Sequence, residues 1–440
     1  MLSCASDQVI NTENNGLNMA AKRRKIFYGW VIVALGFMVM VSTGSCVFYS
    51  FGIFLKPMIA DIGASRGTAT IAYSIMMAIQ GLLAPMVASL IGKFGTRRLM
   101  AAGLTLAAIG LALMSTATQT WQLFLFFGVL TGTGVALGHF LPLSTMATFW
   151  FARKRALVVG LIMAGAGAGT FIMAPIIAYL IGHIGWRSTW LVLAGIVFTV
   201  AAIPSAIFAR TRPEDVGLLP DGGQSSPLEH VPVNIDKNPS FMVDDWDIKS
   251  ALKTPAIWMI TILNSANVFS MMMMNNHQVA HLTDLGFSPV IAASTLGILG
   301  GVSAIGRVSG GALGQKIPPR YLLAIAFLME AIALVIFMNA HTTAAIYAYV
   351  ILFGFAAGSI VVLHIAMIGN YYGAKGYAFL ASMVMVVTTI IGAGSPVFGG
   401  YVYDALQSYS IPFYTCAGAS VIGGICALLA RPPKRQAPSR

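Results

Sequence analysis

Charged side chains are scarce in this sequence. Only 9% of the 440 residues are Asp, Glu, Lys or Arg, whereas 57% are hydrophobic. Soluble domains carry about 25% charged residues, so a chain this poor in charge cannot cover a surface that faces water. The composition therefore excludes an ordinary soluble fold and predicts that the lipid bilayer surrounds most of the chain.

Cysteine and clustered polar residues are also rare. The four cysteines, Cys4, Cys46, Cys416 and Cys426, have no CxxC or other metal-ligand spacing, so we expect buried, unreactive thiols and no metal or other cofactor. There is no GxxxxGK[ST] phosphate loop, and no cluster of acids, His or Cys indicates an enzyme. Basic residues do not alternate with aromatic ones outside the apolar segments, so no nucleic-acid partner is expected.

Long hydrophobic runs make up most of the chain. About 20 apolar residues cross the ~30 Å hydrocarbon core, and their backbone groups must bond within the segment, which predicts helices. We expect an all-α polytopic membrane protein with twelve transmembrane helices in two pseudo-symmetric six-helix bundles. The expected spans are 28–54, 68–90, 98–117, 121–149, 156–181, 188–208, 255–283, 289–314, 320–338, 344–370, 376–403 and 411–429.

The Lys and Arg residues are distributed unevenly between the two sides. If both termini are cytoplasmic, the inner segments hold 22 of the 26, and the outer loops hold only Lys56, Arg66 and Arg187. This bias follows the positive-inside rule and predicts cytoplasmic termini in a cell (inner or plasma) membrane. Residues 1–21 have no apolar centre, so no cleavable signal peptide is expected, and Met19 is an alternative start to Met1.

The pattern of spans divides the chain into five expected parts. These are a cytoplasmic tail at 1–27, a six-helix bundle at 28–208, a cytoplasmic linker at 209–254, a second six-helix bundle at 255–429 and a cytoplasmic tail at 430–440. The end of the linker is either a short interfacial helix or an ordinary connection.

An internal repeat relates the two bundles. Gly128-x-x-x-Gly132 in span 4 recurs as Gly354-x-x-x-Gly358 in span 10, about half the chain further on. A repeat of this length indicates a duplicated six-helix unit. Two such halves form the architecture of one large class of secondary transporters, which favours a transporter over a channel or a membrane enzyme.

The loop after span 2 suggests a family. Residues 88–98 read ASLIGKFGTRR, and this stretch resembles the G-x-x-x-D-R-x-G-R-R loop of the major facilitator superfamily. Gly92 occupies the acidic position, which weakens the usual charge latch between helices. The resemblance implies a conformational role for Lys93 and Arg97.

Two further stretches narrow the branch. Residues 28–30 and 149–157 resemble the two signatures of the monocarboxylate transporter family, and the related oxalate/formate antiporter group shares much of this pattern. In the monocarboxylate family a span-8 arginine, four residues after an aspartate, serves substrate binding and proton coupling. Arg307 matches the arginine, Ser303 replaces the aspartate, and Tyr49 replaces a span-1 lysine of animal members. No Lys or Arg lies between Gly376 and Tyr409 to match the second basic residue of the oxalate antiporter. The resemblance thus implies anion binding by Arg307.

Arg307 is also the strongest signal in the residues themselves. It precedes Lys316 by nine residues, about 13 Å along a helix, and so is expected near the membrane midplane. An arginine there costs at least ~2.5–3.5 kcal/mol, which a partner must offset. A guanidinium binds a carboxylate through two parallel hydrogen bonds. The alternative is a structural pair with Glu330, the acid that lies within an expected span.

Other polar residues within the spans complete the candidate substrate-binding set. His139, His277 and His364 could carry a co-transported proton or be structural, and Asn276 adds to the polarity of span 7. Tyr49 could donate to a carboxylate or act as an interfacial anchor. The full candidate set is Arg307, Tyr49, His277, Asn276, Ser303, His139 and His364.

Small residues and prolines in spans 5 and 11 are expected to allow close packing and bending during transport. They are Gly165, Gly169, Pro175, Gly394 and Pro396. The sequence thus predicts a monomeric secondary transporter of a small organic anion, favouring a monocarboxylate, by proton symport or anion exchange. A carrier of the same fold for a sugar acid, an aromatic acid or a drug-like compound, and a non-transporting membrane sensor, remain as alternatives. The substrate, the coupling ion, uniport and the direction of flux stay open.

Overall fold

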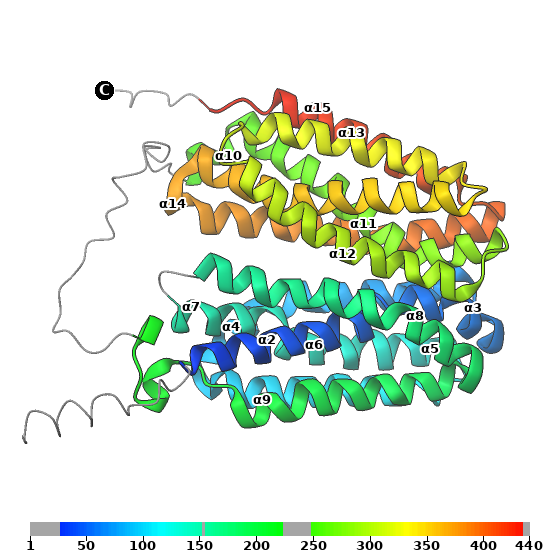
Figure 1. The fold of residues 1–440 in the computed structure, drawn as a ribbon, viewed down its shortest axis with the longest axis horizontal. Coiled ribbons are helices and arrows are strands. Elements are labelled where there is room, and N and C mark those ends of the chain that lie inside the picture. The colour runs from blue at the N-terminus through cyan, green and yellow to red at the C-terminus, as the bar shows by residue number, and fades with distance from the viewer. Residues whose placement is uncertain (1–26, 152–154, 223–247, 434–440) are drawn as a thin grey trace, which may run out of the picture.

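The molecule consists of two groups of long helices that lie one above the other (Figure 1). The computed structural model describes residues 27–151, 155–222 and 248–433. Within these ranges the regular elements are all helical, without a strand, and ten candidate spans are long and apolar enough to cross a membrane. The predicted all-α, multi-pass class is confirmed. Most of the expected tails and of the expected linker fall in residues 1–26, 223–247 and 434–440, outside the described residues.

The first group, at the bottom of Figure 1, is formed by residues 29–151 and 155–208. Its elements are α2 (Gly29–Thr43), η1 (Gly44–Phe48), α3 (Phe51–Ile62), α4 (Arg66–Met114), α5 (Thr120–Leu123), η2 (Phe124–Thr131), α6 (Gly132–Gly138), α7 (Phe140–Trp150), α8 (Arg155–Ile196), η3 (Val197–Ala202) and α9 (Ile203–Phe208). The three η elements named here are π-helical turns within longer helices. Two short 3₁₀ helices follow, η4 (Pro213–Val216) and η5 (Pro220–Gly222).

The second group, at the top of Figure 1, follows the short helix α10. Its elements are α11 (Pro255–Asp284), α12 (Pro289–Leu313), α13 (Pro319–Met338), α14 (Thr343–Leu406) and α15 (Ser410–Leu429). Three of these helices begin with proline, which fits the first helical position because no backbone donor is needed there. Helix α10 spans Ile248–Leu252, so a short helix ends the linker, as one of the two sequence-based alternatives proposed.

Two of the ten candidate spans are too long to be single crossings. At ~1.5 Å per residue, the 49 residues of α4 would measure about 74 Å, more than twice the hydrocarbon core. The chain leaves helical geometry at Gly95 (φ 74°) in α4 and at Gly185 (φ 78°) in α8. Positive φ is readily available to glycine because it has no Cβ. Division at these glycines gives twelve spans, in agreement with the prediction.

Equivalent helices pack at equivalent glycines in the two groups. A Cβ on Gly132 of span 4 would lie 3.0 Å from the Met76 Cα of span 2, and a Cβ on Gly358 of span 10 would lie 2.1 Å from the Ser303 carbonyl oxygen of span 8. Neither position has room for a side chain. This packing is what a duplicated six-helix unit predicts.

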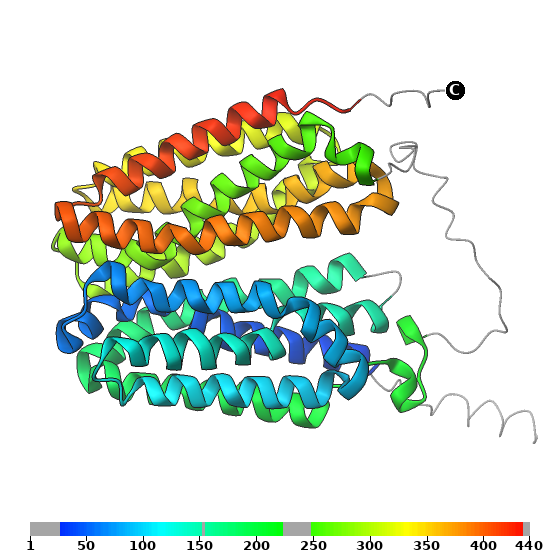
Figure 2. The same cartoon turned by 180° about the vertical axis from the view of Figure 1, so that it is seen from behind.

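The described parts of the two groups touch from one end to about the middle of the spans, where a Cβ on Gly167 of α8 would lie 2.8 Å from the Gly300 carbonyl oxygen of α12. The start of α2 and helix α10 lie at the end that we call the inner end, because the sequence predicts it to be cytoplasmic. Figure 2 shows the same arrangement from behind. Helix α4 packs against α14, and α8 packs against α12. The contact is closest toward the outer end, where a Cβ on Gly400 of α14 would lie 2.5 Å from the Gly67 Cα of α4.

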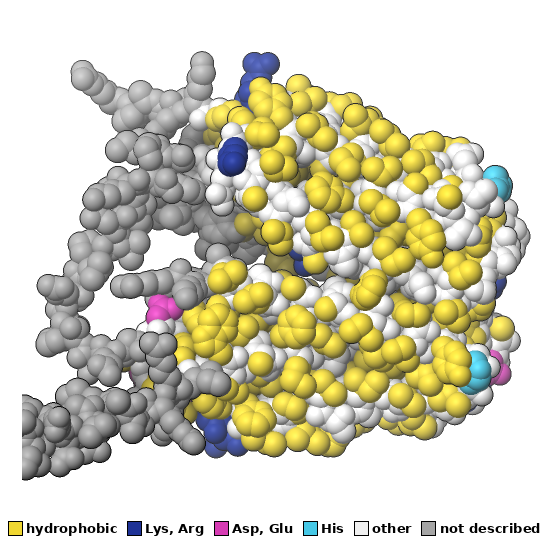
Figure 3. All heavy atoms as spheres, in the orientation of Figure 1, with side chains coloured by type: hydrophobic (Ala, Val, Ile, Leu, Met, Phe, Trp, Pro, Cys, Tyr) yellow, Lys and Arg dark blue, Asp and Glu magenta, His cyan; other side chains and the backbone are white. Residues whose placement is uncertain are grey.

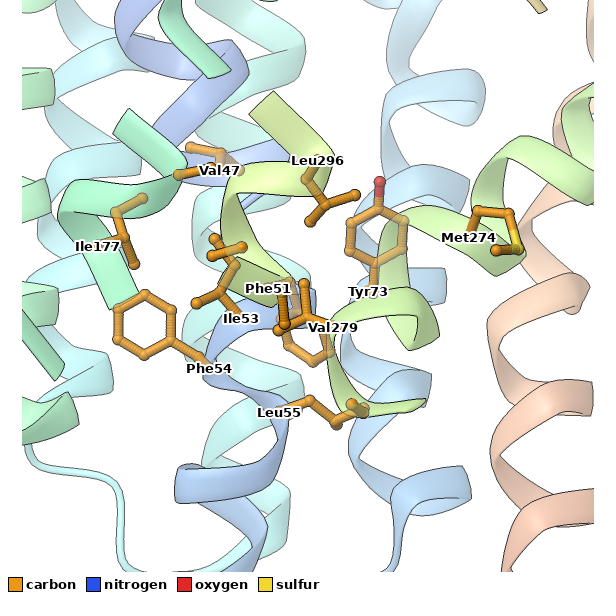
Figure 4. Packing of buried hydrophobic residues seen from close by; sticks show 14 of the residues in the cluster. Val47, Phe51, Ile53, Phe54, Leu55, Tyr73, Ile177, Met274, Val279 and Leu296 are labelled. Atoms are coloured by element: carbon orange, nitrogen blue, oxygen red, sulfur yellow. The ribbon is translucent and has the colours of Figure 1, made fainter. Parts of the chain in front are cut away.

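A continuous apolar cluster seals this outer contact. Figure 4 shows side chains of both groups in it, including Phe51 of α3, Ile177 of α8 and Leu296 of α12. Phe54 is fully buried and stacks on Trp190 with ring centroids 3.8 Å apart. Because the cluster is shared between the groups, opening of the outer end must expose part of it.

Candidate substrate-binding site

Arg307 lies on α12 beside the interface between the two groups. It is six residues before Leu313, so it is about 9 Å from the inner end of the helix. The side chain is half-buried. Its Nε is buried and, among the described residues, has no hydrogen-bond partner. The ion pairs found in the described ranges all involve other residues.

Glu330 does not neutralise Arg307 in this structure. It is fully buried in α13. Asn267 Nδ2 donates to Oε2 at 3.1 Å, and Ser420 Oγ donates to Oε1 at 3.2 Å. Both carboxyl oxygens therefore bond to neutral donors of the second helix group, on α11 and α15.

Tyr49 and His139 come from the first group. Tyr49 follows the π-helical turn η1, and it lies close enough to Arg307 to be influenced by its charge. His139 marks a break between α6 and α7, because Pro142 cannot donate to the carbonyl four residues earlier. The His139 ring packs on Phe48 at 4.9 Å, and its Nε2 is buried with no hydrogen-bond partner in the described part of the chain. Span 1 thus lies between His139 and Arg307.

Two further candidates have unused hydrogen-bonding capacity. Ser303 is one turn from Arg307 on α12, and its buried Oγ has no partner among the described residues. Asn276 donates from Nδ2 to the Met272 carbonyl at 2.9 Å, whereas its buried Oδ1 is likewise unpartnered within those residues. Buried polar atoms in proteins are normally hydrogen-bonded. These atoms therefore mark places where a polar ligand would be stabilised.

The remaining two candidates are histidines of the second group. His277 is seven residues from Asp284, the last residue of α11, and so is about 10 Å from the outer end of that helix. It is fully buried against Tyr409 and Pro396. His364 is half-buried in α14, where its Nδ1 lies 3.0 Å from the Ile360 carbonyl oxygen.

The small residues of α8 hold it against span 1. A Cβ on Gly165 would lie 2.5 Å from the Phe37 carbonyl oxygen, and one on Gly169 would lie 2.3 Å from that of Val41. Pro175 lies within the same helix. These close approaches are internal to the first group.

The corresponding residues of α14, Gly394 and Pro396, have different surroundings. A Cβ on Gly394 would meet no atom of another described residue within 4 Å, so this glycine lies beside open space. The Pro396 carbonyl accepts from Thr70 Oγ1 of α4 at 3.2 Å and is 2.7 Å from His277 Nε2. Pro396 therefore contributes to contact between the groups.

The basic loop after span 2 forms hydrogen bonds within the first helix group. Lys93 and Arg97 are exposed. Arg97 Nε donates to the Ala206 carbonyl, and Thr211 Oγ1 accepts from the Thr96 backbone N–H at 3.0 Å. In this conformation the loop packs against the end of span 6.

Charged residues join the two groups at the outer end. Arg66 of α4 donates to both carboxylate oxygens of Asp284 on α11, at 2.7 and 3.1 Å. Lys56 of α3 pairs with the same carboxylate at 2.7 Å. Asp404 of α14 accepts from the backbone N–H groups of Arg66 and Gly67, at 3.0 and 2.8 Å, at the start of α4. We call Lys56, Arg66, Asp284 and Asp404 the outer latch.

The outer latch segregates charge between the groups. Both cations belong to the first group and both carboxylates to the second. Arg66 also lies over the Tyr403 ring at 3.7 Å, a cation–π contact with α14. Separation of the outer ends must break all these contacts together.

Sequence reasoning missed the latch. Lys56 and Arg66 were used only to orient the chain, and Asp284 and Asp404 lie one residue beyond the expected spans. The available signal was the sign of the charges, because the outer ends of spans 1 and 2 are basic and those of spans 7 and 11 are acidic. Such a pattern indicates pairing only when those ends are known to be adjacent.

Toward the inner end the two groups stand apart. Figure 3 shows a cleft between them, with a Lys or Arg side chain visible inside it. The structure is therefore closed at the outer end and open toward the inner end. A site between the groups at the depth of Arg307 is reached from the inner side.

Comparisons with known proteins agree with this architecture. The sequence profile of the Major Facilitator Superfamily matches residues 32–329 and 304–440. Monocarboxylate transporter 13 of Bos taurus is 27% identical over 408 residues, which cover 92% of this chain and 89% of the relative. Monocarboxylate transporter 3 of Rattus norvegicus is also 27% identical, over 90% of this chain and 79% of the relative.

Solved structures show the same fold. A bacterial homologue of the human lysosomal transporter Spinster, in an inward-facing and occupied conformation, aligns with a TM-score of 0.72 at 15% identity. The alignment covers 92% of this chain and 97% of that one. The inward-facing, unoccupied form aligns with a TM-score of 0.67. With twelve spans, two related helix groups and a profile match along most of its length, this chain belongs to the Major Facilitator Superfamily and resembles its monocarboxylate transporter branch.

Proposed function

We propose that this protein is a secondary active transporter of a small organic anion with one carboxylate, and that Arg307 binds that carboxylate. The observation that supports this most is the buried Nε of Arg307, which has no partner among the described residues. A buried guanidinium N–H without a partner is costly, and an anionic ligand that accepts from it offsets the cost. The similarity to monocarboxylate transporters supports the same ligand class.

The guanidinium has a suitable geometry for this ligand. Nε and one Nη present two parallel N–H groups to the two oxygens of a carboxylate. Tyr49 of the first group and Ser303 of the second supply further polar atoms near the same position. A ligand bound there contacts both groups, and so its presence favours their closure around it.

Transport follows from alternation between two arrangements of the helix groups. In this structure the outer latch is formed and the inner cleft is open. Rocking of the groups about Arg307 would open the outer end and close the inner end. We further propose cytoplasmic termini in a cell membrane and a monomeric carrier. Proton symport and anion exchange are both compatible with one cationic site.

The test is uptake of labelled lactate, pyruvate, formate and oxalate into proteoliposomes, with and without an imposed pH gradient. Arg307→Ala removes two charge-assisted hydrogen bonds of ~1.5–3 kcal/mol each, so uptake should fall by at least about 100-fold. Arg307→Lys keeps the positive charge but loses the two parallel N–H donors of the guanidinium, and should raise KM by about ten-fold or more. Arg320→Lys, at the start of α13, is the matched control and should transport normally.

Three outcomes discriminate between the candidate functions. Wild-type uptake of monocarboxylates that Arg307→Ala abolishes supports the proposal. Unimpaired uptake by well-inserted Arg307→Ala protein refutes the role of Arg307. Absence of monocarboxylate uptake, together with uptake of a labelled sugar acid, aromatic acid or drug-like compound, would assign a different substrate to the same scaffold.

A further inference from the structure

His277 connects the outer latch to the backbone of α14. Its Nε2 lies 2.7 Å from the Pro396 carbonyl oxygen, and its Nδ1 lies 3.1 Å from the Tyr409 hydroxyl. That hydroxyl accepts from Arg66 Nη1 at 2.7 Å, and Arg66 is paired with Asp284. A row of hydrogen bonds therefore runs from the latch, through Tyr409 and His277, to α14.

One arrangement of protons satisfies every atom of this row. A carbonyl oxygen only accepts, so Nε2 of His277 must hold a proton and donate it to Pro396. In a neutral imidazole Nδ1 then accepts from the Tyr409 hydroxyl, whose oxygen accepts in turn from Arg66. The row thus requires neutral His277.

A second proton on His277 is incompatible with the row. Nδ1 would become a donor directed at the Tyr409 oxygen, which already accepts from Arg66. The Tyr409 hydroxyl would lose its acceptor, and one oxygen atom would separate two positive charges. His277 is fully buried, so water does not screen their repulsion.

The carboxylates near His277 already accept hydrogen bonds from other residues. Asp404 of α14 bonds to the backbone N–H groups of Arg66 and Gly67. Asp284, on the same helix as His277, bonds to Arg66 and Lys56. Neither is free to stabilise an imidazolium unless the latch contacts are first broken.

The remaining titratable neighbours are tyrosines and a second histidine. Tyr403 of α14 packs on Tyr409 with ring centroids 4.4 Å apart. His281, one turn along α11, packs edge-on against Tyr409 and has a buried, unpartnered Nε2 within the described ranges. A proton on His281 would add to the positive charge instead of balancing it.

We propose that His277 is a proton-binding site that releases the outer latch. Protonation would separate the outer ends of the two helix groups, and reformation of the row at closure would expel the proton. Since His277 becomes accessible only from the outer side, that proton returns to the side from which it came. The site therefore senses acidity at the outer face and differs from a coupling site that carries protons across. This inference does not depend on the transported anion.

Distances between spin labels at the outer end test this directly. Thr116 of the first group and His341 of the second are exposed in outer turns and can be labelled as cysteines in a background without the native cysteines. In nanodiscs without substrate, acidification from about pH 8 to pH 5 should increase the long-distance population. For one proton the ratio of open to closed forms changes by up to about tenfold per pH unit.

Matched variants assign the response to one side chain. His277→Gln can donate from its amide nitrogen to Pro396 and accept from Tyr409, but it cannot gain a proton, so it should stay closed at every pH. Tyr409→Phe interrupts the row while leaving the Arg66–Asp284 pair, and should lose the pH response. His183→Gln, an exposed histidine at the same end, should respond as the wild type does.

Several results would overturn the proposal. A wild-type distance distribution that does not change with pH would do so. A wild-type response in His277→Gln, or a response abolished by His281→Gln and retained in His277→Gln, would reject His277 as the site. Loss of uptake in Arg307 variants leaves these distances unaffected, so failure of the anion assignment and failure of the latch proposal are distinguishable.

Discussion

Neutralisation of Asp284 should shift the carrier toward the form that is open at the outer end. Asp284→Asn preserves the shape of the side chain but removes the charge that pairs with Arg66 and Lys56. The Arg66 side chain is 9% exposed and that of Asp284 25%, so this charge-assisted pair is partly shielded from water. The Lys56 side chain is 37% exposed, and its pair contributes little after screening by solvent.

The size of the shift follows from these exposures. Loss of the bidentate Arg66 contact costs about 2 kcal/mol, because one neutral hydrogen bond to Asn remains possible. That energy changes an equilibrium constant by about 30-fold. An outer-open population of about 1% would therefore rise to about one quarter, which is well within the range of distance measurements.

The assay is the Thr116–His341 label pair at a pH where the wild type is closed. Asp61→Asn provides the matched control, since Asp61 forms an outer ion pair with Arg187 that lies within the first helix group. Breaking that pair should leave the distance distribution unchanged. The reasoning fails if Asp284→Asn behaves as the wild type, or if both variants shift the distances equally, which would indicate a general loss of structure.

Two further predictions concern packing within each helix group. Gly169→Ala places a Cβ against the Val41 backbone and should destabilise the protein by about 1–3 kcal/mol, as measured by thermal unfolding in detergent. The control is Gly182→Ala, which has open space around it and should be neutral or slightly stabilising. Glu330→Gln can accept from Asn267 Nδ2 through its amide oxygen and donate to Ser420 Oγ through its amide nitrogen, so it should unfold like the wild type. Glu330→Leu removes the acceptor of the buried Asn267 Nδ2, whereas Ser420 Oγ keeps its bond to the Cys416 carbonyl, and it should cost about 1–3 kcal/mol. A Glu330→Leu variant as stable as the wild type would show that this cluster does not stabilise the second group.

The large-scale architecture could be predicted because it depends on one-dimensional properties of the chain. Apolar length determines which segments cross a bilayer, and the repeat at Gly128 and Gly354 reveals the duplication without any knowledge of contacts. The loop glycines were harder to interpret. Gly95 and Gly185 each mark a turn with positive φ between two spans, although in the sequence they resemble the many packing glycines around them.

Local deviations in the helices could not be predicted. The π-helical turn before Tyr49 and the break at His139 change which way these side chains point, and only the second has a visible cause, Pro142. Arg307 lies six residues before the inner end of α12, and its position at the membrane midplane stays a prediction. Ser303 was correctly expected near Arg307, since four residues are one helical turn.

The sequence by itself determined that this chain spans a membrane, how often it does so, that its halves are related, and that Arg307 is an unusual charge within the spans. Tertiary structure alone decided which charges meet. Arg66 and Asp284 are more than 200 residues apart and belong to different helix groups, so no local pattern relates them. Their pairing, and the position of His277 beside it, depend on how the two groups tilt against each other. That tilt is determined by interhelical packing at sites such as Gly67 and Gly400, where backbones touch.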